Sequence, residues 1–273
     1  MSIKTILVPI THPEEASRVL AVATELAASL DAHVTGMAVR RQVMLPVYSM
    51  GAIPDVILTQ FEKDEDDRLA GLRTAFDKAI AAAGWQARSD WQIYGGPLAQ
   101  AVAEAGHYAD LIVLGQPDGA TAPDDIAMLP GDLVMSASAP VLMVPQIGCK
   151  SLMGGEALIG WHGGREIARA VRDALPLLAL MGKTTLVTIG GDAAEAGEPA
   201  ATYLARHGLD VSLQREPATD LDPADILLNL GAERDARLIV LGAYGHSRLR
   251  QFVLGGTTSQ MLKHMTVPVL LSR

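Results

Sequence analysis

A single cysteine, Cys149, is present among the 273 residues, so the chain can form no internal disulfide. Basic side chains are also scarce, since 22 Lys and Arg stand against 31 Asp and Glu and give a net charge of −9. A protein that binds nucleic acid needs a basic face, so this balance argues against nucleic acid as a partner. No apolar stretch reaches the roughly 18 residues of a membrane-spanning helix without a charge or a helix breaker, so we expect no membrane partner.

Signals for targeting, metal binding and common catalytic groups are missing as well. The segment from Met1 to Pro9 leads directly into an apolar strand pattern and has no signal-peptide apolar region. Together with the single cysteine, this predicts a cytoplasmic protein. No HxxxH or CxxC spacing indicates a metal site, and no Ser-His-Asp or Cys-His signature indicates nucleophilic catalysis. We therefore expect no metal centre and at most a slow ATPase, for which no base is identifiable.

What the chain does contain is an internal repeat. Residues 109–115 read Ala-Asp-Leu-Ile-Val-Leu-Gly and recur as Ala-Arg-Leu-Ile-Val-Leu-Gly at 236–242, an offset of 127 (236 minus 109). Each half alternates strand and helix patterns, which predicts a parallel sheet with right-handed crossovers. The expected strands are 3–9, 32–39, 88–94, 110–115 and 140–145, then 156–161, 183–189, 208–214, 237–242 and 267–272.

The repeat predicts two tandem α/β domains, residues 1–147 and 154–273. They are joined within Gln146–Gly155, a segment that lacks periodicity. The first domain carries about 25 extra residues, because the first strands are offset by 152 and the later ones by 127. We place this insertion near 41–66. Its apolar part, Val43–Phe61, either binds a partner or covers the first domain's crevice, and the charged run 62–68 predicts the start of a long helix.

The most informative stretch follows the apolar run Leu238–Leu241, which is typical of a buried parallel strand. Glycines after such a strand permit tight turns and close approach of the backbone to a ligand. The N-terminus of the helix expected next favours phosphate, and Thr257, Thr258 and Ser259 are its candidate N-cap residues. The candidate phosphate-binding residues are Gly242, Gly245, Gly255, Gly256, Thr257 and Thr258.

The spacing Gly242-x2-Gly245-x9-Gly255 resembles the nucleotide-binding signature of the universal stress proteins. The resemblance implies two doubly wound five-stranded domains, Rossmann-like and of the adenine nucleotide alpha-hydrolase-like type, each with strand order 3-2-1-4-5. A ligand would bind in the crevice beyond the carboxyl ends of strands 1 and 4. The resemblance also implies that the glycines and the hydroxyl side chains after them hold the triphosphate of ATP, with Mg²⁺ as its counterion.

Two residues depart from the family pattern. Gly256 stands where the family usually has Ser, and His162 stands where it usually has the Asp that contacts the nucleoside. An imidazole can stack on a base or meet a phosphate, but it cannot accept ribose hydrogen bonds as a carboxylate does. His162 and Arg248 remain candidate nucleotide contacts, with solvated loop residues as the alternative reading. Two functions stay open: an adenine-nucleotide sensor in stress adaptation, or a scaffold or small-ligand carrier that binds no nucleotide.

The first half keeps Gly115 at the position of Gly242 but lacks the other two glycines of this motif. Asp118 stands at the position of Gly245 and Met128 at that of Gly255. Because a carboxylate repels phosphate, we expect a degenerate first half and one nucleotide per chain.

The strands Val141–Pro145 and Val267–Ser272 end the two expected sheets. An apolar edge strand has to be paired or covered, so we expect these two strands to meet in an intramolecular pseudo-dimer of the domains. A further homodimer is left open.

Overall fold

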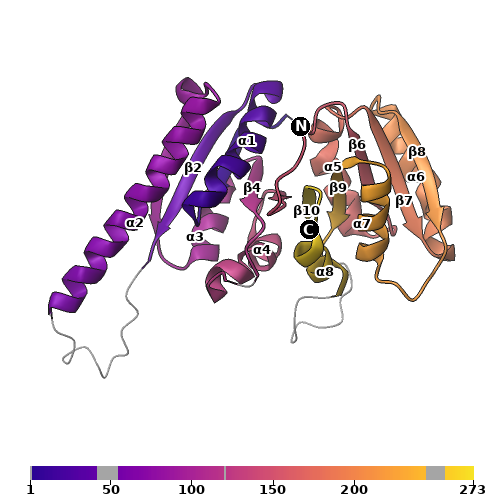
Figure 1. Cartoon of the computed structure of the whole chain (residues 1–273). Helices are drawn as coiled ribbons and strands as arrows, with labels where there is room; N and C mark the ends of the chain where they lie inside the picture. Colours follow the sequence, from indigo (N-terminus) through magenta and orange to yellow (C-terminus); the bar gives the residue numbers. More distant parts are fainter. Residues whose placement is uncertain (1, 42–54, 120, 244–255) are drawn as a thin grey trace.

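The computed structural model describes residues 2–41, 55–119, 121–243 and 256–273 (Figure 1). It has the predicted α/β fold, with five strands in each half. The strands are β1 (Thr5–Pro9), β2 (His33–Arg40), β3 (Ser89–Gly95), β4 (Leu111–Gly115), β5 (Val141–Val144), β6 (Glu156–Gly160), β7 (Lys183–Ile189), β8 (Val211–Glu216), β9 (Ala236–Gly242) and β10 (Val269–Ser272). The helices are α1 (Pro13–Leu30), α2 (Asp55–Ala82), α3 (Leu98–Ala105), α4 (Asp124–Ser136), α5 (Arg165–Leu178), α6 (Gly191–Arg206), α7 (Pro223–Glu233) and α8 (Gly256–His264), with 3₁₀ turns at Gln86–Arg88 and Gly106–Tyr108.

All ten strands form one sheet in the order β3-β2-β1-β4-β5-β10-β9-β6-β7-β8. Read from the outer edge toward the middle, each half has the predicted order 3-2-1-4-5, and every pair within a half is parallel. In each half the chain therefore reverses direction between the first and fourth strands. This reversal places a switch point between β1 and β4 and another between β6 and β9.

The two fifth strands meet at the middle of the sheet, as expected from their apolar edges. β5 and β10 pair antiparallel, with Leu270 opposite Leu142 and both side chains fully buried. We call this pair of strands the seam. The seam removes two apolar edges that would otherwise need another partner.

Helices cover both faces of the sheet, and each core layer runs across the seam. One layer holds buried side chains from α1, α2, α5 and α6, and the other holds those from α3, α4, α7 and α8. Leu142 and Leu270 belong to the first layer, whereas Met143 and Val269 belong to the second. The two halves thus share their cores. No helix among the described residues has the length and apolar character needed to cross a bilayer.

Two expected boundaries were wrong. β8 begins at Val211 rather than at residue 208, because Gly208 has φ 80° and forms the left-handed turn that ends α6. α2 begins at Asp55, well before the charged run 62–68 that was expected to start it. The run therefore lies in the body of the helix, where Glu65 faces inward and is buried.

The start of α2 covers no crevice in its described part. Val56 and Ile57 are 72% and 56% exposed. In Figure 1 this end of α2 extends away from the sheet. Residues 42–54, which complete the apolar segment considered above, lie outside the described residues.

Glu65 anchors the inner face of α2 to β2. Its carboxylate accepts hydrogen bonds from the Arg68 guanidinium at 2.6 and 2.8 Å and from the Arg41 N–H at 2.7 Å. Burial raises the pKa of this carboxyl, but the hydrogen bonds from Arg68 and Arg41 outweigh burial and hold the pKa below its ordinary 4.5. A lowered folded-state pKa means stability that is present above the unfolded pKa and is lost as the pH falls through the folded value.

We expect Glu65→Gln to lower the free energy of unfolding by about 2 kcal/mol at pH 7, because the Arg68 guanidinium loses its charged acceptor. Urea unfolding of wild type and variant at pH 7 and in steps below pH 4.5 should show the difference shrinking toward acid. Asp77→Asn is the control on the same helix, because the Arg73–Asp77 pair is about half exposed and should contribute little. If Glu65→Gln lowers the free energy of unfolding equally at pH 7 and at the most acidic step, the charge-based explanation is contradicted.

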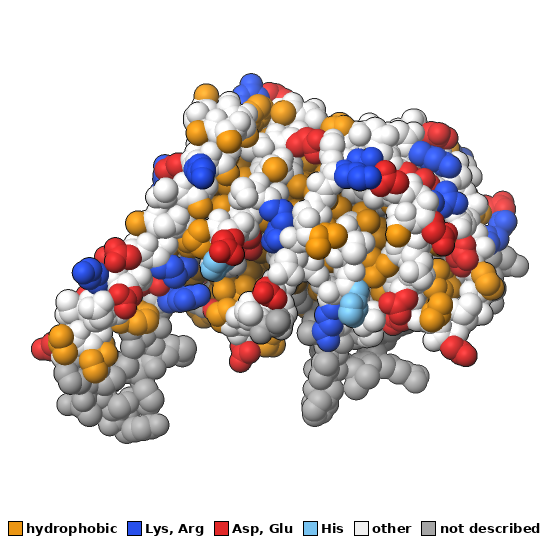
Figure 2. All heavy atoms as spheres, viewed as in Figure 1, with side chains coloured by type: hydrophobic (Ala, Val, Ile, Leu, Met, Phe, Trp, Pro, Cys, Tyr) orange, Lys and Arg blue, Asp and Glu red, His pale blue; other side chains and the backbone are white. Residues whose placement is uncertain are grey.

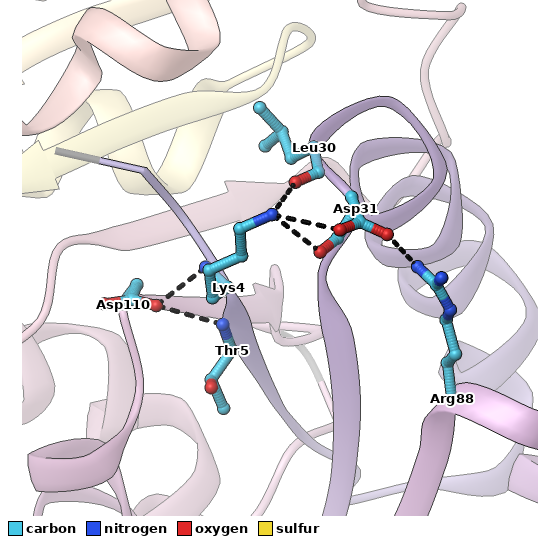
Figure 3. A network of polar contacts seen from close by, with 6 residues as sticks. All are labelled: Lys4, Thr5, Leu30, Asp31, Arg88 and Asp110. Atoms are coloured by element: carbon cyan, nitrogen blue, oxygen red, sulfur yellow. Dashed lines mark hydrogen bonds and ion pairs between the residues drawn. The ribbon is translucent and has the colours of Figure 1, made fainter.

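A polar network fixes the amino ends of β1 and β4 (Figure 3). One carboxylate oxygen of Asp110 accepts the N–H groups of Lys4 and Thr5 at 2.7 and 3.0 Å. The Lys4 ammonium donates to the Leu30 carbonyl and to Asp31, which also pairs with Arg88. Hydrogen bonds from Arg88 and then Lys4 hold the pKa of Asp31 below its usual value. These charges lie at the end of the sheet opposite the switch-point crevices.

On the face drawn in Figure 2, basic and acidic side chains are interspersed with one another.

Candidate functional site

Four helix N-termini lie at the carboxyl ends of the strands in the C-terminal half. α5 follows β6, α6 follows β7, α7 follows β8 and α8 follows β9, so each helix begins after a parallel strand has ended. Their free N–H groups and dipoles make this end of the sheet electropositive. α7 is capped by Asp222, whose side chain accepts the Ala224 N–H at 2.8 Å. α5 begins after Gly164, an N-cap residue that offers no side-chain hydrogen bond.

Gly242 ends β9 directly against the first turn of α5. A Cβ built on Gly242 would collide with the amide nitrogen of Ile167 and lie 2.6 Å from the carbonyl carbon of Glu166. Both atoms belong to backbone, which cannot move aside as a side chain can. Gly242 is therefore required by packing between β9 and α5, whether or not a ligand also approaches it.

His162 and Glu166 lie close together at the start of α5. A Cβ on Gly164 would lie 2.5 Å from the His162 ring and 3.2 Å from a Glu166 carboxylate oxygen, so both side chains lie against Gly164. A hydrogen bond from Arg165, at 2.7 Å, is the main reason why the pKa of Glu166 lies below its usual value, and the charge of His162 lowers it further. The crevice beside β6 thus contains an ionised carboxylate in addition to the helix N-terminus.

α8 begins at least two residues earlier than its hydroxyl residues suggested. Gly256 is its first residue, so Thr257, Thr258 and Ser259 lie inside the helix and the prediction that they form the N-cap was wrong. The helix includes them because Thr258 and Met261, three residues apart, are the two side chains that it buries. A Cβ on Gly256 would lie 3.4 Å from the Asp222 carboxylate, so a second acidic group lies beside this helix start.

The corresponding crevice of the N-terminal half is filled by the protein itself. Glu15, in the first turn of α1, accepts the Thr11 N–H at 2.5 Å, the Thr11 hydroxyl at 2.8 Å and the His12 N–H at 3.1 Å. Its other carboxylate oxygen would lie 2.8 Å from a Cβ on Gly115, at the end of β4. A carboxylate of the chain thus occupies the donors that an anion would need at this switch point.

Three predicted site residues, Gly245, Arg248 and Gly255, lie outside the described residues. Gly242 and His162 both lie at the start of α5. The first turn of α8, with Gly256, Thr257 and Thr258, lies beside the start of α7. Asp118 of the N-terminal half accepts a hydrogen bond from the Thr121 hydroxyl at 2.7 Å. Within the described part of the chain, no group of three or more His, Cys, Asp or Glu side chains is arranged to hold a metal ion.

Comparison with known proteins identifies the C-terminal segment. Residues 192–273 match the model of the universal stress protein family. The C-terminal segment of the chain is therefore similar to this family. A universal stress protein of Synechocystis is 50% identical over 36 residues, a stretch that covers 13% of this chain and only 12% of that relative's length.

Solved structures extend the likeness in fold to the whole chain. A universal stress protein from Archaeoglobus fulgidus covers 100% of this chain and is itself covered to 97%, with a TM-score of 0.75 and 16% identity. A functionally unknown protein from Pseudomonas aeruginosa covers 99% of this chain, and 92% of it is covered, with a TM-score of 0.64 and 18% identity. At these identities the matches establish a shared fold for both halves of the chain.

Sequence reasoning missed the acidic residues of both crevices. Asp222-Pro223 is a helix-start signal, an N-cap carboxylate before proline at the first helical position. His12-Pro13-Glu14-Glu15 has the spacing of a capping box, with the acid three residues after the cap. Glu166 gave no comparable signal, since its position beside His162 depends on how the loop after β6 folds.

Proposed function

We propose that the chain is a universal stress protein that binds an adenine nucleotide, ATP or AMP, in the crevice of its C-terminal half and uses it for sensing or signalling in stress adaptation. The phosphates lie at the start of α8, where Gly256, Thr257 and Thr258 form the first turn. The absence of a side chain at Gly242, Gly245 and Gly255 lets the backbone approach the nucleotide closely. His162 and Arg248 contact the nucleotide through their side chains. The glycine spacing, which resembles that of the family's nucleotide-binding members, supports this assignment.

The contrast between the two halves carries the proposal. At the first switch point, Glu15 already takes three hydrogen bonds from Thr11 and His12. At the second switch point, Gly164 caps α5 without a side chain. A helix N-terminus whose cap residue supplies no acceptor is suited to an anion from outside the chain.

The charge of the crevice bears on which form of the nucleotide binds. The carboxylates of Glu166 and Asp222 lie beside the starts of α5 and α8 and repel a bare triphosphate. A nucleotide that carries Mg²⁺ has a smaller net charge and meets less repulsion. We therefore expect ATP to bind better with Mg²⁺ than without it.

A second function is favoured by two specific observations. The packing of Gly242 on α5 explains one glycine of the motif without any ligand, and the two carboxylates disfavour phosphate. A scaffold or small-ligand carrier with the same fold would show both features. Denaturing the protein after purification without added ligand, and chromatography of what it releases, distinguishes a nucleotide from another small molecule or none.

Gly256→Asp is expected to abolish nucleotide binding while the protein stays folded. The new side chain has room, since its Cβ meets its nearest neighbour at an ordinary 3.4 Å, and an acid in a first helical turn is favourable. Beside Asp222, however, it adds a second negative charge where the phosphates are proposed to lie.

Calorimetric titration with Mg²⁺-ATP measures the effect of this substitution. Met128→Asp is the control in the first half, because Met128 is 55% exposed and stands at the position of Gly255, next to that of Gly256. Wild-type affinity in Gly256→Asp would rule out phosphate binding at the start of α8.

A further inference from the structure

Gln116 belongs to the N-terminal half, yet its side chain contacts the C-terminal half. Its Nε2 donates to the main-chain carbonyls of Leu262 at 2.9 Å and Lys263 at 3.1 Å, at the end of α8. Its Oε1 accepts the N–H of Gln146 at 2.9 Å, and its own N–H donates to the Val144 carbonyl at 2.8 Å. One side chain thus joins the end of β4, the start of the linker and the last turn of α8.

The helix that Gln116 caps is short and buries few side chains. α8 has only 9 residues, and isolated helices shorter than about 12–15 residues are marginal in water. Its buried side chains are Thr258 and Met261. The last carbonyls of any helix lack partners within the helix, and Gln116 supplies donors to two of them.

The matching position in the C-terminal half lacks such a side chain. Ala243 occupies the equivalent position after β9, and its N–H donates to the Ser272 carbonyl at 2.9 Å, as that of Gln116 does to Val144. An alanine has no side-chain donor, so α4 receives no such cap from Ala243. The asymmetry matches that of the crevices, because the half whose own crevice is filled by Glu15 contributes the cap.

We propose that Gln116 is a positioning residue for the nucleotide site, and that the N-terminal half acts on that site by fixing α8. This inference rests on the proposed function, since Gly256 and Thr257 at the other end of α8 are the proposed phosphate contacts. A helix of nine residues is about 13 Å long and moves as one piece. Fixing its last turn therefore fixes its first turn against α7.

The test compares Gln116→Ala and Gln116→Glu with wild type in the full-length protein. Two lost hydrogen bonds should weaken Mg²⁺-ATP binding about fivefold to tenfold in Gln116→Ala. Gln116→Glu should bind more weakly still, because its carboxylate oxygen faces the two carbonyl oxygens. Hydrogen exchange followed by mass spectrometry should show faster exchange of the α8 amides in both variants and no change in α5.

Glu25→Ala is the control for a merely structural role. The Glu25 carboxylate, on α1, accepts the Ser151 hydroxyl and the Leu152 N–H, so it also joins the N-terminal half to the linker but does not touch α8. This variant should lose stability and keep wild-type affinity and α8 exchange. If Glu25→Ala weakens nucleotide binding as much as Gln116→Ala, positioning by Gln116 is wrong.

The two proposals can fail separately. Wild-type protein that binds no adenine nucleotide overturns the proposed function, and α8 exchange in the same samples still decides whether Gln116 fixes the helix. Unchanged α8 exchange in Gln116→Ala and Gln116→Glu overturns the further inference even if the wild type binds ATP.

Discussion

Gly242→Ala is expected to destabilise the protein by about 3 kcal/mol or more, among the largest effects of any single methyl group in the chain. The added Cβ would collide with the backbone of Glu166 and Ile167 in the first turn of α5. Relief requires moving β9 away from α5, which disturbs the core beneath both. Urea unfolding measures the loss, and nucleotide affinity should fall with it because β9 and α5 form the walls of the crevice.

Gly115→Ala is the matched control, because Gly115 occupies the equivalent place at the end of β4. The nearest atoms to its added Cβ are the side-chain ends of Glu15 at 2.8 Å and Arg18 at 3.0 Å. These ends can shift, so we expect a loss of about 1 kcal/mol. Equal losses in the two variants would show that Gly242 is not held by backbone packing.

Separating the two halves is expected to have the other large effect. Expressed as residues 1–150 and 151–273, each half exposes an apolar strand, β5 or β10, and half of two shared core layers. Each fully buried leucine of the seam contributes roughly 1.5–3 kcal/mol, so neither half should be stable and monomeric alone. Refolded together, the halves should form a one-to-one complex, which sedimentation or native mass spectrometry detects.

Leu142→Asp in the first fragment gives the control for this experiment. Leu142 lies opposite Leu270 in the seam and is fully buried, so a carboxylate there should prevent the complex. Stable, soluble monomeric halves with no affinity for one another would contradict the seam as a stabilising interface.

The sequence was sufficient to predict the sheet because its apolar runs are buried on both faces. Leu238–Leu241 and its copy at 111–114 contain no polar residue, and such runs leave few alternatives to a central parallel strand. The seam could be predicted for the same reason, since Val141–Val144 and Val269–Leu271 are apolar strands with no further strand pattern beside them. The boundary at Gly208 was less predictable, because it depends on a single turn.

The candidate site was only partly predictable, because side chains from different elements compose it. The glycine spacing located the end of β9 but could not show that Gly242 packs on α5. The Glu15 carboxylate lies in the first crevice, where it accepts a hydrogen bond from the Thr11 N–H and lies beside Gly115. Glu15 and Gly115 are 100 residues apart in the chain. The cap from Gln116 to α8 spans 146 residues, and no local pattern signals it.

The number of adenine nucleotides bound per chain tests the central claim most directly. Calorimetric titration of full-length protein with Mg²⁺-ATP should give one site per chain, because Glu15 fills the crevice of the N-terminal half and the motif is complete only after Leu241. A stoichiometry near two would show that the N-terminal crevice accepts nucleotide despite Glu15. The absence of binding would contradict the account and favour a scaffold or carrier that retains the fold.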